Sequence, residues 1–136
     1  MEKIKKCVGA IIYNDRGEIF LMSSPKWNSW VVPGGKILEN ETEEEALKRE
    51  IEEELDIEIE NIVKVGEKIK PKSKDFYDEE VRFHFIDFFA KAKQNEIAPN
   101  KEISECGWFT IEEALELNLL DTTRKFVEQF RDFNKD

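Results

Sequence analysis

The sequence predicts a mixed α/β fold, and three observations support this prediction. Strand-like and helix-like segments follow in the order strands, helix, strands, helices. Residues 81–92 form the most apolar run, with aromatic residues on both faces, which is typical of a central strand buried on both sides. Two Thr-x-x-Glu capping boxes mark where helices begin. This order, without an internal repeat, favours a single domain over residues 1–136.

The composition is that of a globular protein. The chain has 136 residues, of which 40% are hydrophobic, with ten Phe and three Trp, so it can bury a core. Its net charge of −10 argues against a broad surface for a nucleic-acid polymer, whose backbone it would repel. Small phosphorylated ligands remain compatible with this charge, because bound divalent metals reverse its local sign.

The cysteines and the N-terminal segment indicate a cytoplasmic protein. Cys7 and Cys106 lie far apart without metal-type spacing, so we expect small buried hydrophobes in a reducing compartment. The apolar run after the basic N-terminus, residues 7–13, is too short and too β-branched for a signal peptide or membrane span. We therefore expect no membrane partner.

The first part of the chain predicts a hairpin followed by a short strand. Residues 5–13 are a predicted strand, and the turn-forming residues 14–17 lead to its partner over 18–23. A polar loop follows. Residues 30–32 form a short strand, which we expect a Pro-Gly-Gly turn over 33–35 to end.

The middle of the chain predicts one helix and a further strand. Thr42 and Glu45 form a capping box, so a helix should begin there and end near Leu55. Alternating apolar residues over 57–65 predict a strand. The alternating lysines over 68–74 indicate a sheet edge or a loop.

The C-terminal part predicts a short strand over residues 106–109 and two helices. Thr110 opens the first helix, and Asp121 or Thr122 caps the second. The inner stripe of the second helix is formed by Phe126, Val127, Phe130 and Phe133.

Three acids cluster on one side of the first helix. On a helical wheel, Glu50, Glu53 and Glu54 share an arc of roughly 100°, beside the buried stripe. That stripe is formed by Leu47, Ile51 and Leu55. Unpaired like charges at this border cost stability, and oxygen-preferring Mg²⁺ or Mn²⁺ would compensate them. Arg49 can also brace the cluster. The alternative is a solvated, charge-rich helix.

The string around this helix resembles the Nudix box, Gly-x5-Glu-x7-Arg-Glu-U-x-Glu-Glu-x-Gly-U, in which U is a bulky aliphatic residue. Gly35, Glu41 and the segment from Arg49 match it over residues 35–57, and the final Gly alone is replaced, by Asp56. The surrounding elements follow the same order, so the resemblance covers nearly the whole chain. It implies an α/β/α sandwich with a mixed sheet, the box loop-helix and two C-terminal helices.

The resemblance implies a role for each residue at a motif position. Glu50, Glu53 and Glu54 would hold Mg²⁺ or Mn²⁺ with a carbonyl of Gly34 or Gly35, and Glu50 would also deprotonate the attacking water. Further roles fall to the positions around them. Arg49 would orient Glu50, Glu41 would pair with Arg49 or stabilise the entry to the helix, and Asp56 would form a left-handed helix end.

Some family members also recruit a further acid from the loops opposite the helix, as a metal ligand or as the base. Here Glu102 or Glu105 is best placed, followed by Glu79 and Glu80, although each also fits as a surface acid.

The implied reaction is hydrolysis of a nucleoside diphosphate linked to another moiety. Nucleoside triphosphates including damaged ones, ADP-ribose and dinucleoside polyphosphates all remain candidate substrates, because Pro71 and Tyr77 only approach the spacings of two subfamilies. The alternative is a non-catalytic nucleotide-sensing or partner-binding module, which should have lost one of the three acids. A homodimer is compatible with the resemblance.

Candidate substrate contacts lie outside the motif. Trp27 could stack on a base or anchor its loop, and Lys70 and Lys72 could meet a polyphosphate or protect a strand edge. Tyr77 is the fourth candidate. The single histidine, His84, fits a hydrogen-bonded core residue better than a catalytic one.

Overall fold

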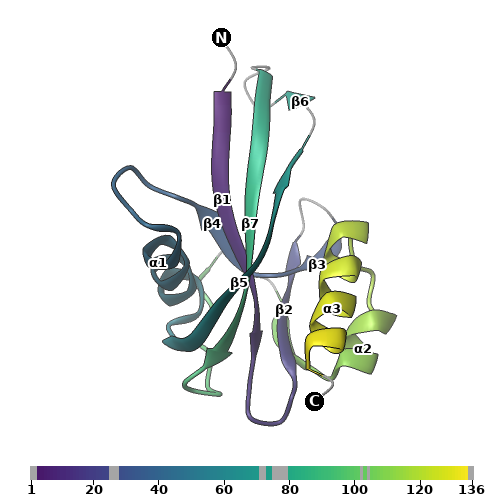
Figure 1. Cartoon of the computed structure of the whole chain (residues 1–136). Coiled ribbons are helices and arrows are strands. Elements are labelled where there is room, and N and C mark those ends of the chain that lie inside the picture. Colours follow the sequence, from purple (N-terminus) through teal and green to yellow (C-terminus); the bar gives the residue numbers. More distant parts are fainter. Residues whose placement is uncertain are drawn as a thin grey trace.

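A computed structural model describes residues 3–24, 28–70, 73–74, 80–101, 103 and 105–134. One sheet is covered by α1 on one face and by α2 and α3 on the other (Figure 1). The elements are β1 (Lys3–Tyr13), β2 (Ile19–Ser24), β3 (Ser29–Val31), β4 (Gly34–Lys36), α1 (Glu43–Leu55), β5 (Ile59–Ile69), β6 (Ser73–Lys74), β7 (Glu80–Ala92), β8 (Cys106–Phe109), α2 (Ile111–Glu116) and α3 (Asp121–Phe133). The predicted α/β/α sandwich is confirmed.

The sheet is mixed, and β7 lies in its interior between β1 and β5. The main order is β3-β2-β1-β7-β5, while β4 pairs with β1, β6 with β7 and β8 with β2. β1 and β7 run parallel over their whole length, and the other pairings are antiparallel. The apolar run over residues 81–92 is therefore an interior strand paired on both edges, in agreement with the buried strand that its sequence predicted.

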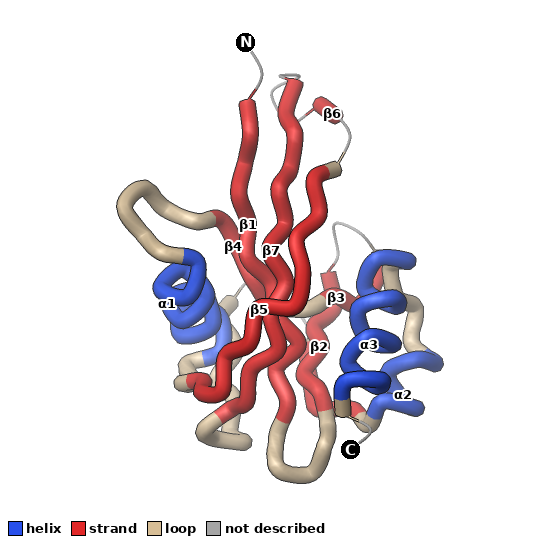
Figure 2. Tube along the Cα trace, in the orientation of Figure 1, coloured by secondary structure: helices blue, strands red, loops and turns tan. Residues whose placement is uncertain are grey.

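The predicted Pro-Gly-Gly turn is wrong. Gly34 and Gly35 belong to β4, whose backbone pairs with Val8 and Gly9 of β1. A Cβ on Gly34 would overlap the Val8 carbonyl and lie 2.8 Å from the Gly9 Cα, so only glycine permits this approach. The loop of residues 37–42 then links β4 to α1 (Figure 2).

The capping boxes predicted the starts of α1 and α2 correctly. Thr42 and Thr110 each accept a hydrogen bond from the backbone of the glutamate three residues later. The helix α3 lies where it was predicted, but its predicted cap was wrong, because the N-cap is Leu120, without a side-chain cap, and Asp121 is already in the first turn. No helix among the described residues is long and apolar enough to span a membrane.

The sheet separates two apolar cores. The α1-side core contains Leu47, Ile51 and Leu55 against Ile86 and Phe88. The α3-side core is formed chiefly by Ile11, Phe89, Phe126, Val127 and Phe130. Alternate residues of one strand therefore enter opposite cores, as a period of two requires.

One residue of the predicted inner stripe of α3 departs from it. Phe133 is 53% exposed, because it lies on the last turn of the helix. Its ring still contacts Phe89, with centroids 4.9 Å apart.

Candidate functional site

Arg49 organises the loop that precedes α1. Its Nε donates to Glu41 Oε2 at 2.6 Å and its Nη2 to Glu41 Oε1 at 2.9 Å, a two-pronged pair. Its Nη2 also donates to the Lys36 carbonyl at 2.9 Å. The hydrogen bonds from Arg49 and from the Leu38 backbone hold the pKa of Glu41 below its usual range. The predicted pairing of Glu41 with Arg49 is confirmed.

The three clustered acids have different surroundings. Glu50 is 16% exposed at its side chain and accepts from Arg49 Nη1 at 2.9 Å. Glu54 Oε1 accepts from the Gly34 N–H at 3.2 Å. Glu53 is 59% exposed and lies 3.3 Å from the same Arg49 nitrogen. Two of the acids thus reach the two-glycine strand, while the third stays near solvent.

Gly35 leaves room for the carboxylate of Glu50. A Cβ at this position would overlap the Glu50 carboxyl carbon and lie 2.6 Å from Oε1. Two carboxylates of α1, those of Glu50 and Glu54, therefore lie against the backbone of β4. This contact joins Gly35, the first residue of the predicted box, to Glu50 in the helix of the same box.

The donor chemistry at this point fits a hard divalent cation. Carboxylate oxygens of Glu50 and Glu54 lie against Gly34 and Gly35, whose carbonyls are also oxygen donors. In the described part of the chain, however, no three His, Cys, Asp or Glu side chains converge as a complete metal-binding group. Glu50 and Glu53 both face Arg49. The predicted metal site thus stays a prediction.

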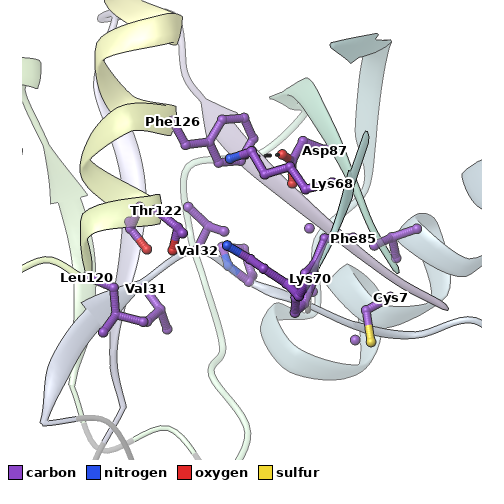
Figure 3. Close-up of a pocket in the computed structure, with 16 residues that line it drawn as sticks. Cys7, Val31, Val32, Lys68, Lys70, Phe85, Asp87, Leu120, Thr122 and Phe126 are labelled. Carbon is purple, nitrogen blue, oxygen red and sulfur yellow. Dashed lines mark ion pairs between the residues drawn. The ribbon is translucent and has the colours of Figure 1, made fainter. Parts of the chain in front are cut away.

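A pocket of about 350 Å³ opens on the other side of the same glycines, between the sheet and α3 (Figure 3). Most of its wall is apolar, including Val32, Phe85 and Phe126. Its polar lining comes from Lys68, Lys70, Asp87, Thr122 and Thr123. Gly34 and Gly35 line this pocket as well, so the same two glycines border both the pocket and the acids of α1.

Charges in the pocket are partly buried. Lys68 Nζ lies 3.7 Å from Asp87 Oδ2, and the Asp87 side chain is 15% exposed. Burial raises the pKa of Asp87, and the charge of Lys68 opposes the rise. Burial also raises the pKa of the Cys7 thiol, and the negative charge of Glu50 contributes to this increase. The charges of Lys36 and Lys5 oppose this increase.

These features agree with the comparison to known families. The model of the NUDIX domain matches residues 3–130. The chain belongs to the Nudix family. Its Nudix box supplies the contacts among Glu41, Arg49 and Glu50 described above.

Several Nudix relatives are similar to the chain. It is 33% identical over 90 residues to an RNA pyrophosphohydrolase from Ruthia magnifica subsp. Calyptogena magnifica, covering 66% of this chain and 45% of that protein. It is 29% identical over 112 residues to an 8-oxo-dGTP diphosphatase from Proteus vulgaris, covering 79% of this chain and 95% of that protein. The chain spans less than half the length of the RNA pyrophosphohydrolases it matches.

Solved Nudix structures have the same fold. The crystal structure of a MutT NUDIX hydrolase from Burkholderia pseudomallei has a TM-score of 0.75 and 29% identity, covering 93% of this chain and 98% of that chain. The NUDIX domain of Shewanella oneidensis NrtR, solved with ADP-ribose, has a TM-score of 0.76 at 18% identity, covering 98% of this chain and 88% of that chain. At that identity the second likeness concerns the fold alone.

The predicted residues outside the box have varied outcomes. Lys70 lines the pocket, and Glu105 is exposed in the loop before β8. His84 is half-buried, with Nε2 3.5 Å from Glu67 Oε1. Predicted residues that lie outside the described part are Trp27, Pro71, Lys72, Tyr77, Glu79 and Glu102.

Sequence reasoning missed the pocket residues that come from distant elements. Asp87 was read only as part of an apolar strand, and Thr122 only as a helix cap. The sequence feature that could have marked Asp87 as a site residue is its charge within the apolar run over residues 81–92. A carboxylate in a buried strand is costly unless it has a partner or a role.

Proposed function

We propose that the protein hydrolyses a nucleoside diphosphate linked to another moiety, with water attacking a phosphorus atom of the diphosphate. The observation that carries this proposal is that one two-glycine strand contacts two acids of α1 and also lines the pocket. A nucleotide bound with its organic part in the pocket would place its diphosphate beside Glu50 and Glu54. The names of the pyrophosphohydrolase and diphosphatase relatives support the same class of reaction.

The contacts of the box residues indicate a separate role for each of them. Glu50, Glu54 and a carbonyl of Gly34 or Gly35 would hold Mg²⁺ or Mn²⁺, and Glu53 would join them after rotating from Arg49. Such a metal lowers the pKa of bound water and neutralises the diphosphate. Glu50 is proposed as the base that accepts the proton of the attacking water. Arg49 orients the Glu50 carboxylate through its 2.9 Å hydrogen bond.

The pocket is proposed to bind the nucleoside end of the substrate. Its apolar walls suit a ring, and Lys70 can approach a phosphate. Nucleoside triphosphates, including damaged ones, ADP-ribose and dinucleoside polyphosphates are the substrate classes to compare. Residues Trp27, Lys72, Tyr77, Glu102 and Glu105 remain candidates for further contacts.

The test is turnover of these compounds with Mg²⁺, measured as release of mononucleotide or phosphate. We expect at least one compound to be hydrolysed, and Glu50→Gln and Glu54→Gln each to lower kcat by ~10² or more. Glu52→Gln is the matched control, because Glu52 is exposed on the same helix, and should retain full activity.

Two results would contradict the proposal. One is the absence of turnover across the whole panel in Mg²⁺ and Mn²⁺, which would favour a nucleotide-sensing module. The other is full activity in both the Glu50 and the Glu54 variants, with their melting temperatures unchanged.

A further inference from the structure

The pocket contains a carboxylate that the fold does not need. Among the described residues that line the pocket, Asp87 alone has a carboxylate. It lies on the α3-facing side of β7, between Phe85 of the pocket and Phe89 of the α3-side core. An apolar residue there would extend the core, whereas a partly buried carboxylate carries a desolvation cost.

The ion pair between Lys68 and Asp87 is long, so Lys68 compensates the charge of Asp87 only in part. Their closest approach is 3.7 Å, longer than a good hydrogen bond, and replacing such a pair by apolar residues is often neutral or stabilising. Figure 3 shows Lys68 and Asp87 side by side near Phe126, within the pocket. The pair thus presents an acceptor and a donor next to an aromatic wall. This arrangement is suited to recognising the polar edge of a flat ligand.

The chemistry of the pair selects among nucleobases. The edge of guanine offers two adjacent N–H donors, at N1 and N2, beside a carbonyl oxygen at O6. A carboxylate can accept both N–H groups while the neighbouring ammonium donates to the oxygen. Adenine offers an amine next to a ring nitrogen with a lone pair, which would face the carboxylate unfavourably.

We propose that Asp87, supported by Lys68, is the specificity-determining residue of the pocket and selects bases with a guanine-type edge. This inference rests on the proposed function, since it assigns the pocket to the base of the substrate. Burial raises the pKa of Asp87, and N–H donors from a base would favour its ionised form. Binding of the base thus relieves part of the desolvation cost.

The test measures binding, so that it does not depend on turnover. Non-hydrolysable α,β-methylene analogues of dGTP, dITP and dATP are titrated into the full chain by calorimetry. We expect the guanine analogue to bind about tenfold or more tightly than the adenine analogue. The hypoxanthine analogue, which lacks the 2-amino group, should bind with intermediate affinity.

Substitution of Asp87 should change the preference in a defined direction. In Asp87→Asn the amide can accept from the adenine amine and donate to its ring nitrogen, and it can equally accept from guanine N1–H and donate to O6, so we expect adenine binding to tighten and the guanine preference to disappear. Asp87→Ala should lose the preference without gaining one for adenine. Asp15→Asn, at an exposed aspartate outside the pocket, is the charge-matched control and should bind as the unchanged chain does.

The outcomes separate this inference from the proposed function. Equal binding of the three analogues, no binding of any, or an unchanged preference in folded Asp87→Asn and Asp87→Ala would overturn the role of Asp87. Turnover of any nucleotide in those cases would leave the proposed hydrolysis standing. A guanine preference without turnover would instead reject the hydrolysis and retain the base selectivity.

Discussion

At the scale of the residue, Gly34 and Gly35 show why two adjacent glycines need not serve the same purpose. At Gly34 the nearby atoms are backbone atoms of Val8 and Gly9, which cannot move without disturbing β1. At Gly35 they belong to the end of the Glu50 side chain, which can rotate. The first glycine therefore permits the sheet to form, and the second permits the carboxylate to reach the sheet.

Alanine substitutions should separate these two roles. We expect Gly34→Ala to lower the free energy of unfolding by at least about 2 kcal/mol, because β4 is forced from β1. Gly35→Ala should keep most of its stability but lower kcat by ~10², because Glu50 is displaced. Urea unfolding and nucleotide turnover of both variants check this. Equal loss of stability in the two variants would refute the distinction.

Individual residues of the site were predictable where a motif fixed their partners. Glu41 and Arg49 are joined as the Nudix box implied, and Arg49 contacts Glu50. Asp87 has no such motif around it. Its place in the pocket depends on the register of β7 against β1 and on the approach of α3, which one strand sequence does not encode.

At the scale of the element, α1 shows which helix boundaries can be read from sequence. Its start follows from the capping box of Thr42 and Glu45, which is a local interaction. Its end follows from Asp56, which adopts the left-handed conformation at φ 56° and ψ 40°. The start of α3 was missed because Leu120 provides no side-chain cap. Likewise β4 was missed because its pairing with β1 is a long-range contact.

The conformation of Asp56 predicts a stabilising substitution. An L-residue in the left-handed region costs about 1–2 kcal/mol, which glycine avoids, although the greater entropy of glycine in the unfolded chain cancels part of the gain. Asp56→Gly should therefore raise the free energy of unfolding by about 0.5–1 kcal/mol. Asp56→Ala should lower it, because alanine has neither the freedom of glycine nor a short polar side chain. Thermal unfolding of both variants decides this, and a less stable glycine variant would contradict it.

At the scale of the whole molecule, the two cores are coupled because the same strands contribute side chains to both of them. Phe88 and Phe89 are consecutive in β7 yet belong to the α1-side and the α3-side core, respectively. The same holds for Ile11 and Ile12 of β1. The apolar run over residues 81–92, which covers both faces of its strand, predicted such a two-sided sheet, but the strand order 3-2-1-7-5 arises from contacts between distant segments. A core on one face cannot lose its strands while the other remains intact.

This linkage predicts a single unfolding transition that two local reporters should share. Trp108 packs against the α1-side core and Trp30 against the α3-side core, so variants that keep one of them report on one face. Leu47→Ala removes a fully buried side chain from the α1-side core and should cost about 2–5 kcal/mol. In a Trp27→Phe background, the free energy of urea unfolding should decrease by the same amount whether Trp30 or Trp108 reports the transition. A shift confined to Trp108 would show that the faces unfold separately, and that the shared strands do not couple them.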